Sequence, residues 1–338
     1  MQLDIIQILS LLVVFVSFLL AASLLTMRSI NYQSNLMLAI FLIVGAIDSD
    51  SIFLGSYIYP NYPALGIFLS SLIFIKMPLL YLYLISVIYS DFKLKWKHIW
   101  HVLPFIINFI VFIPRFYAID TEGQLEYLLS QTASHRHFEV KFSYIVLHAQ
   151  IFFYLILSFT LVIKYRRLLL ENYSNASLFN YKWLFQFIVI FSIEYVIASL
   201  KNLYMFFGSE DAYFYSMLIT SLAALAYIVW VVLKTIRHPE LFRGIDSKLQ
   251  LVTKLLKDEG NIEQNILSEE AKQPAKFNEK VEVLNNYMIE NEPFLDPSLT
   301  IYELSKQLNF STRDMSLLIN HDLNQHFFDF VNGFRIRK

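Results

Sequence analysis

Seven long apolar runs, separated by shorter polar connectors, fill the first 236 residues of the chain. Each run has about the 20 residues that a helix needs to cross the hydrocarbon core of a bilayer. They predict membrane spans over Leu3 to Met27, Leu36 to Tyr59, Ala64 to Ser90, Ile99 to Tyr117, Ser143 to Tyr165, Trp183 to Phe207 and Tyr213 to Ile236. The first run begins with Asp4 and is too long for the apolar part of a signal peptide, so we expect a retained span.

The pattern becomes polar and charged from Gly244 onward. Apolar residues there recur at steps of four, three and four, which predicts a helix with one apolar stripe formed by Ile245, Leu249, Val252 and Leu256. Such a stripe suits either an amphipathic helix on the inner membrane face or a short seam between two copies of the chain, which would make a homodimer. We expect the residues from Asp258 to Lys276 to form a flexible tether.

The last 62 residues (277–338) have the pattern of a small helical domain. A first helix with one apolar face ends at Pro293. Thr300 and Glu303 have the spacing of a capping box, in which each side chain satisfies a free backbone N–H group of the other residue. Asn309 occupies the turn that follows, and Ser311 is expected to cap a second helix. The predicted fold is therefore all-α, with a seven-span membrane domain (1–243), a linker (244–276) and a helix-turn-helix domain (277–338).

The second helix of this domain has two different faces. At 100° per residue, one arc contains the apolar residues Met315, Leu318 and Ile319. The opposite arc contains the candidate DNA contacts Thr312, Arg313, Ser316, Leu317 and Asn320. Arginine reads guanine and asparagine reads adenine in the major groove, and hydroxyl groups hold phosphates. The alternative is an ordinary solvated polar face, as on any surface helix.

Charge adds an orientation to this pattern. The 27 basic and 28 acidic residues nearly cancel, so the whole chain has no excess of charge for binding a polyanion. Basic residues are concentrated in the first, third and fifth connectors and after the seventh span. The positive-inside rule then predicts a multi-pass protein of the cytoplasmic (inner) membrane, with its N-terminus outside and its C-terminus in the cytoplasm, where DNA is. The chain has no cysteine, which excludes disulfides and thiolate metal sites.

Ionisable residues inside the predicted spans are the second candidate site. They are costly in a bilayer and usually face the interior of the bundle. The candidates are Asp48, Asp50, Lys76, Glu194, Lys201 and His148. Asp48 and Lys76 lie at similar depths, so we expect Asp48 or Asp50 to pair with Lys76. The set has two interpretations, a structural ion pair that stiffens the bundle or a site that senses a small molecule, ion or membrane signal.

A family resemblance supports the DNA-binding interpretation. The stretch DPSLTIYELSKQLNFSTRDMSLLINHDLNQHFFDFVNGFRIRK, from Asp296 to Lys338, resembles the first helix-turn-helix and the start of the linker helix of AraC-type transcriptional regulators. This resemblance implies a module with two helix-turn-helix units that enter adjacent major grooves, with Ser311 to Asn320 as the first recognition helix. MPLLYLYLISV (77–87) and YSNASLFNYKWL (173–184) are similar to the seven-span domain found joined to such modules.

The chain departs from that family in three respects. It reaches Lys338 within the linker helix, so we expect the second helix-turn-helix to be missing from it. Gly333 lies inside that helix, where glycine costs about 1 kcal/mol relative to alanine. Nine acidic residues outnumber six basic ones from Phe277 onward, which opposes tight nonspecific binding to DNA.

Other functional classes find little support in the sequence. We expect no cofactor, no metal site and no enzymatic activity, because no nucleotide-binding loop, catalytic triad or zinc signature is present. The alternative to a membrane-bound regulator is a seven-span transporter or receptor whose C-terminal helical domain binds a protein partner. A transporter would use the charges within the spans to couple substrate or protons.

Overall fold

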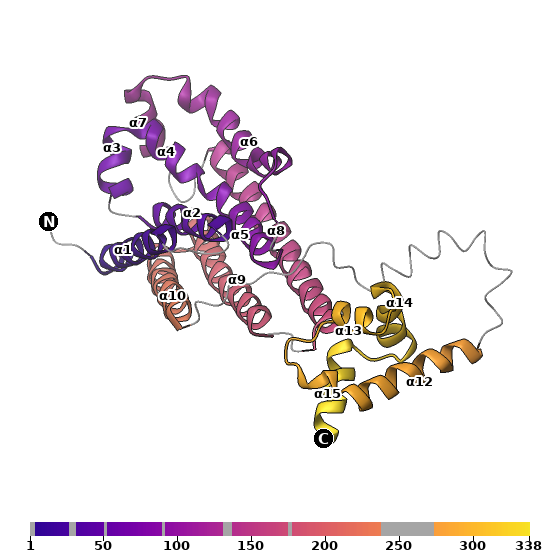
Figure 1. Cartoon of the computed structure of the whole chain (residues 1–338). Helices are drawn as coiled ribbons and strands as arrows, with labels where there is room; N and C mark the ends of the chain where they lie inside the picture. Colours follow the sequence, from indigo (N-terminus) through magenta and orange to yellow (C-terminus); the bar gives the residue numbers. More distant parts are fainter. Residues whose placement is uncertain are drawn as a thin grey trace. The chain divides into compact units, whose positions relative to one another are not determined.

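The computed structural model describes residues 4–26, 32–50, 53–89, 92–130, 137–174, 178–237 and 274–338. Over these ranges the chain is helical and contains no strand, which confirms the predicted all-α class. The predicted stripe from Ile245 to Leu256 and nearly all of the predicted tether lie outside the described residues. The chain divides into two compact units, Met1–Leu161 with Trp183–Ile245, and Val162–Lys182 with Asp246–Lys338 (Figure 1).

Within the described residues, seven helical segments are long and apolar enough to cross a membrane. The first two are α1 (Ile5–Thr26) and α2 (Tyr32–Ser49). The third joins α4 (Pro63–Ser71) to α5 (Ile73–Ile88), and the fourth joins η2 (Trp96–Val102), α6 (Leu103–Phe112) and η3 (Ile113–Tyr117). The last three are α8 (Phe138–Asn172), α9 (Leu178–Phe207) and α10 (Glu210–Arg237). Three shorter helices, η1 (Leu54–Ile58), α3 (Tyr59–Asn61) and α7 (Thr121–Leu129), connect the spans.

The two largest differences from the predicted span boundaries are at the ends of the second and fifth spans. The second span was expected to end at Tyr59, but α2 ends at Ser49. The carboxylate of Asp50 accepts a hydrogen bond from the backbone N–H of Phe53 at 2.9 Å, which starts a new short helical segment there. The fifth span was expected to end at Tyr165, but α8 continues to Asn172. The last part of α8, from Val162, belongs to the second unit.

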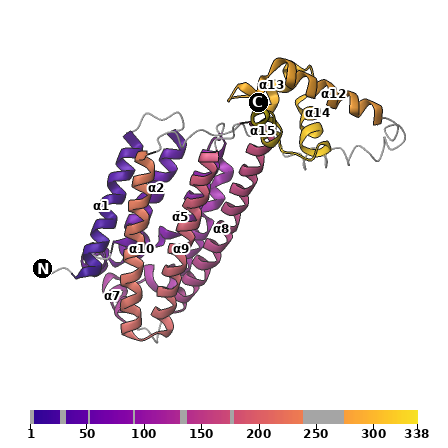
Figure 2. The same cartoon turned by 90° about the horizontal axis from the view of Figure 1, so that it is seen from below.

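The first unit is a bundle in which α1 packs against α2 and α10, and α2 packs against α5 (Figure 2). Pro78 lies inside α5 and has no N–H, so the carbonyl of Phe74, four residues earlier, loses its helical hydrogen bond. Gln150 of α8 donates its Nε2 to that carbonyl at 2.8 Å. A side chain 76 positions away therefore satisfies the acceptor that the proline leaves free.

The second unit contains α12 (Pro274–Asn291), η6 (Pro293–Leu295), α13 (Ile301–Gln307), α14 (Thr312–Leu317), η7 (Leu318–Asp322) and α15 (Phe327–Arg337). Its core is a cluster of buried apolar residues from every one of these helices: Leu284, Met288, Phe294, Leu299, Ile301, Leu304, Met315, Leu318, Ile319, Phe327, Phe330 and Val331. The packing face predicted for the second helix is thus buried. The predicted tether ends earlier than expected, because α12 begins at Pro274.

The predicted turn chemistry of this unit is present. Thr300 accepts a hydrogen bond from the N–H of Glu303 at 3.2 Å, and the Glu303 carboxylate accepts one from the N–H of Thr300 at 2.8 Å. Asn309 has φ of 56°, the left-handed conformation that asparagine tolerates. Ser311 caps α14 by accepting from the N–H of Asp314 at 3.0 Å. These local interactions fix the angle between α13 and α14.

Candidate functional site

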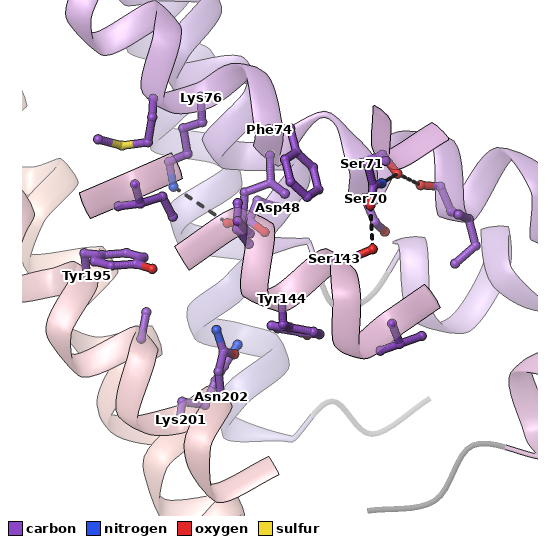
Figure 3. A pocket seen from close by; sticks show the side chains of 18 of the residues that line it. Asp48, Ser70, Ser71, Phe74, Lys76, Ser143, Tyr144, Tyr195, Lys201 and Asn202 are labelled. Carbon is purple, nitrogen blue, oxygen red and sulfur yellow. Dashed lines mark hydrogen bonds and ion pairs between the residues drawn. The ribbon is translucent and has the colours of Figure 1, made fainter. Parts of the chain in front are cut away.

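A cavity of about 550 Å³ lies within the first unit (Figure 3). Its wall is built from α2, α4, α5, α6, α8 and α9, so most of the spans contribute to it. Four ionisable side chains predicted from the sequence line it, namely Asp48, Lys76, Glu194 and Lys201. Aromatic side chains complete the wall, among them Phe74, Tyr144, Phe191 and Tyr195. A mixed charged and aromatic lining is typical of a site for a small polar molecule.

Lys76 is the best-held charge in the cavity. Its Nζ atom lies 3.7 Å from Oδ2 of Asp48, and Figure 3 shows this pair across the wall between α5 and α2. The same ammonium lies 6.0 Å from the ring centroid of Phe41 and 5.8 Å from that of Phe191. Aromatic faces attract cations, so the two rings and the carboxylate together stabilise the half-buried charge.

Glu194 and Lys201 are held differently. Both lie on α9, and the Glu194 carboxylate interacts electrostatically with Lys76 and Lys201. Among the described residues, neither Glu194 nor Lys201 makes a side-chain hydrogen bond or an ion pair within 4.0 Å. The neighbouring Asn202 also lines the cavity, and its buried Oδ1 has no hydrogen-bond partner among these residues. Buried polar groups are normally satisfied, so the Asn202 oxygen is an exception in this part of the wall.

Uncharged polar residues also line the cavity. Asn108 of α6 donates its Nδ2 to Ser71 of α4 at 2.9 Å, and its Oδ1 accepts from the hydroxyl of Ser143 of α8. Tyr59 shares a hydrogen bond with Ser70 on a further part of the wall. Serine, asparagine and tyrosine are common in apolar spans, so composition alone did not single out the serines and Tyr59.

Two predicted members lie outside the cavity wall. Asp50 is hydrogen-bonded to the backbone of Phe53, and Asp48, not Asp50, is the partner of Lys76. His148 shares a hydrogen bond with the hydroxyl of Tyr195, which itself lines the cavity. His148 therefore supports the wall from behind. Within the described residues, no group of three or more His, Asp or Glu side chains has a metal-binding arrangement.

The predicted DNA-reading face lies in the second unit, and its five residues differ in accessibility. Arg313 is exposed, whereas Thr312 and Leu317 are half-buried and Ser316 is buried. Asn320 lies past the end of α14, in η7. Its Oδ1 accepts a hydrogen bond from the N–H of Phe327 at 2.9 Å. Asn320 thus also joins the recognition helix to the start of α15.

The end of α8 contacts this face within the second unit. The Nδ2 of Asn320 donates to the carbonyl of Glu171 at 3.2 Å. Two residues later, Tyr173 forms an antiparallel bridge with Thr300, and the N–H of Ser174 donates to the carbonyl of Leu299 at 3.1 Å. The segment Glu171–Ser174, here called the α8 extension, therefore pairs with the start of α13 and with the end of the recognition helix.

Arg335 of α15 holds the other side of the α8 extension. Its guanidinium donates to the carbonyl of Ser174 at 3.0 Å and to the hydroxyl of Ser174 at 3.1 Å. The same group donates to the carbonyls of Phe294 and Asp296 at 2.6 and 2.8 Å. Hydrogen bonds from the Ser298 hydroxyl and N–H lower the pKa of the neighbouring Asp296 carboxyl. Ser174 is fully buried in this arrangement.

No protein-family model, no curated protein and no solved structure matches this chain. The resemblance to AraC-type regulators therefore rests on the residues from Asp296 to Lys338. The geometry adds two features to those residues, a charged cavity inside the first unit and a helix of spanning length, α8, whose end is hydrogen-bonded to Asn320.

Proposed function

We propose that the chain is a membrane-bound transcriptional regulator of the AraC type, with its C-terminus in the cytoplasm. One observation supports this proposal more strongly than the others. The helix α8 is of membrane-spanning length, and its extension is hydrogen-bonded directly to Asn320 of the candidate recognition helix. A signal that shifts α8 thus has a short physical path to a DNA-reading surface.

The same contact suggests how DNA binding is controlled. Asn320 is the residue expected to read adenine, and its amide nitrogen is bonded to the Glu171 carbonyl while Ser316 beside it is buried. With the α8 extension in place, the Asn320 end of the reading face is engaged and only Arg313 is well exposed. We propose that release of the α8 extension frees this face for DNA and that the cavity receives the triggering signal.

The first experiment tests DNA recognition. The full chain in lipid nanodiscs is used to select duplexes from a random pool, and affinity for selected and scrambled DNA is compared. Arg313→Ala is expected to reduce that discrimination by about 1 to 3 kcal/mol. Arg337→Ala removes the same charge from an exposed position of α15 and is expected to weaken both DNAs alike. Equal discrimination by the wild type and Arg313→Ala would remove the assigned contact, and no enrichment would favour the alternative of a protein-binding domain.

The second experiment tests control by the α8 extension. Residues in an antiparallel bridge have Cα atoms about 4.5 to 5.5 Å apart, which suits a disulfide. Because the chain contains no cysteine, the double variant Tyr173→Cys with Thr300→Cys forms one defined crosslink. The oxidised form is expected to bind selected DNA at least about tenfold more weakly than the reduced form of the same protein, a difference of about 1.4 kcal/mol. Equal affinities would show that the docked segment does not oppose DNA binding.

A third experiment tests the orientation. Reporter fusions after Lys97, Tyr127 and Arg243 are expected to report inside, outside and inside. An outside result at Arg243 would place the helix-turn-helix away from DNA and end the proposal.

A further inference from the structure

Two side chains of α9 carry opposite charges and have no ion-pair partner within 4.0 Å among the described residues. Glu194 and Lys201 are seven residues apart, which places them on one face of the helix and about 10 Å apart along its axis. Both side chains line the same cavity. Figure 3 shows Lys201 and Asn202 on one turn of α9, with Tyr195 farther along the same helix. The wall therefore presents a negative and a positive group at a fixed separation.

The other pair of charges in the cavity satisfies itself. Asp48 and Lys76 lie 3.7 Å apart as an ion pair, and Lys76 also interacts electrostatically with Glu194 at longer range. Glu194 and Lys201 have no ion-pair partner within 4.0 Å among the residues described, and the buried Oδ1 of Asn202 is also unsatisfied. Both residues are half-buried, and partly desolvated charges without a close partner are unfavourable, so a ligand that brings both opposite charges relieves both.

We propose that the cavity binds a small zwitterion, with its ammonium group at Glu194 and its carboxylate at Lys201 and the amide nitrogen of Asn202. All residues of this binding site belong to the first unit. Only the role of the bound zwitterion as a signal rests on the proposed function.

The separation of the two groups limits the ligand. For side chains that extend at right angles to the α9 axis, the two charged groups lie about as far apart as their backbone positions, and a hydrogen bond of about 2.8 Å at each end then leaves roughly 4 to 5 Å between the ligand's own charges. That is the reach of an amino acid whose amino and carboxyl groups are separated by a few methylene groups. The methylene groups would pack against the apolar and aromatic wall formed by Phe191, Tyr195 and Ala198.

Calorimetry and thermal-shift measurements on the full chain in nanodiscs, without DNA, test the proposal. The probes are glycine, 4-aminobutanoate and 8-aminooctanoate, with butanoate and butylamine as singly charged controls. We expect 4-aminobutanoate to bind at least tenfold more tightly than either control and than the shorter and longer zwitterions. Binding of no probe, or equal binding of butanoate and 4-aminobutanoate, would overturn the proposal.

Variants that remove one charge test which group of the ligand each residue binds. Glu194→Gln is expected to reduce affinity for 4-aminobutanoate at least tenfold and to leave butanoate unchanged, whereas Lys201→Met is expected to weaken both. Glu210→Gln, at the exposed start of α10, is the matched control and should leave both probes unchanged. Retained binding of butanoate by Glu194→Gln shows that this variant is folded. If 4-aminobutanoate binds as expected but the same protein selects no DNA, the proposed function is refuted. The proposed zwitterion site would still be supported.

Discussion

The helices α13 and α14 each begin with a side chain that accepts a hydrogen bond from a free N–H group of the first turn, whereas the helices around the cavity contain polar side chains without a hydrogen-bond partner among the described residues. Thr300 and Ser311 cap α13 and α14, and every helix of the second unit contributes to one buried apolar cluster. In the first unit, Glu194 and the Asn202 oxygen have no hydrogen-bond partner among the described residues, and a cavity of about 550 Å³ separates the helices.

This difference is the one expected if the second unit holds a surface in a fixed shape and the cavity receives a ligand. A recognition helix must be held at a fixed angle to read base edges, and local caps with dense packing provide that. A cavity with a polar lining reduces the packing of its own walls, and proteins tolerate that cost mainly at functional sites. The predictions below measure the contrast, beginning with the largest effect.

The largest difference is expected from one substitution made in both regions. Met315→Ala removes a fully buried side chain from the dense cluster of the second unit and should destabilise it by about 2 to 5 kcal/mol. Met77→Ala removes an equally large side chain that already borders the cavity, so less packing is lost and a cost below about 2 kcal/mol is expected. Amide hydrogen exchange of α14 and α5 in the full chain measures both. Equal costs would mean that the cavity walls are packed as tightly as the small domain.

A smaller effect is expected from the hydrogen bond between Gln150 of α8 and the Phe74 carbonyl of α5. Gln150→Leu leaves the Phe74 carbonyl without a donor and is expected to destabilise the bundle by about 1 to 3 kcal/mol. Pro78→Ala restores an N–H to α5 and should recover much of that loss in the double variant. Thermal unfolding in detergent gives the four stabilities of this cycle. Additive effects would show that Gln150 does not replace the hydrogen bond that Pro78 removes.

The same contrast explains what the sequence predicted. Caps, left-handed turns and buried faces depend on residues within about four positions of each other, so Thr300 with Glu303, Asn309 and the Met315 face were predicted correctly. The charges lining the cavity were predictable because ionisable residues are rare in spans, which selected Asp48, Lys76, Glu194 and Lys201.

Contacts between distant segments were not predictable in this way. Gln150 meets Phe74 across 76 positions, and Asn320 meets Glu171 across 149. Periodicity on the second helix placed Ser316 and Asn320 on a polar face, but only the fold shows that the α8 extension engages Asn320. Pro78 within a span was an available signal, since it predicts a carbonyl in need of a donor, although it does not identify which donor.

A cap substitution should have a still smaller effect. Ser311→Ala removes the acceptor for the Asp314 N–H and is expected to destabilise α14 by about 1 kcal/mol, affecting all DNA sequences alike. Ser298→Ala, which changes a loop serine outside the helix starts, is the comparison. Hydrogen exchange at the first turn of α14 measures the cap, and an unchanged exchange rate in Ser311→Ala would show that water replaces the serine without cost.

The smallest effect comes from two glycines. A Cβ atom added to Gly333 in α15 has no neighbouring atom within 4 Å, and alanine loses less backbone entropy than glycine in a helix. Gly333→Ala is therefore expected to stabilise the second unit by about 0.5 to 1 kcal/mol, measured as slower exchange of the α15 amides. The same atom added to Gly66 in α4 would lie 2.5 Å from the Tyr59 ring, which lines the cavity, so Gly66→Ala must displace that ring despite its better helix propensity. If both substitutions stabilise their helices equally, displacing the Tyr59 ring costs no measurable free energy. The hydrogen bond between Tyr59 and Ser70 would then not hold the ring in place.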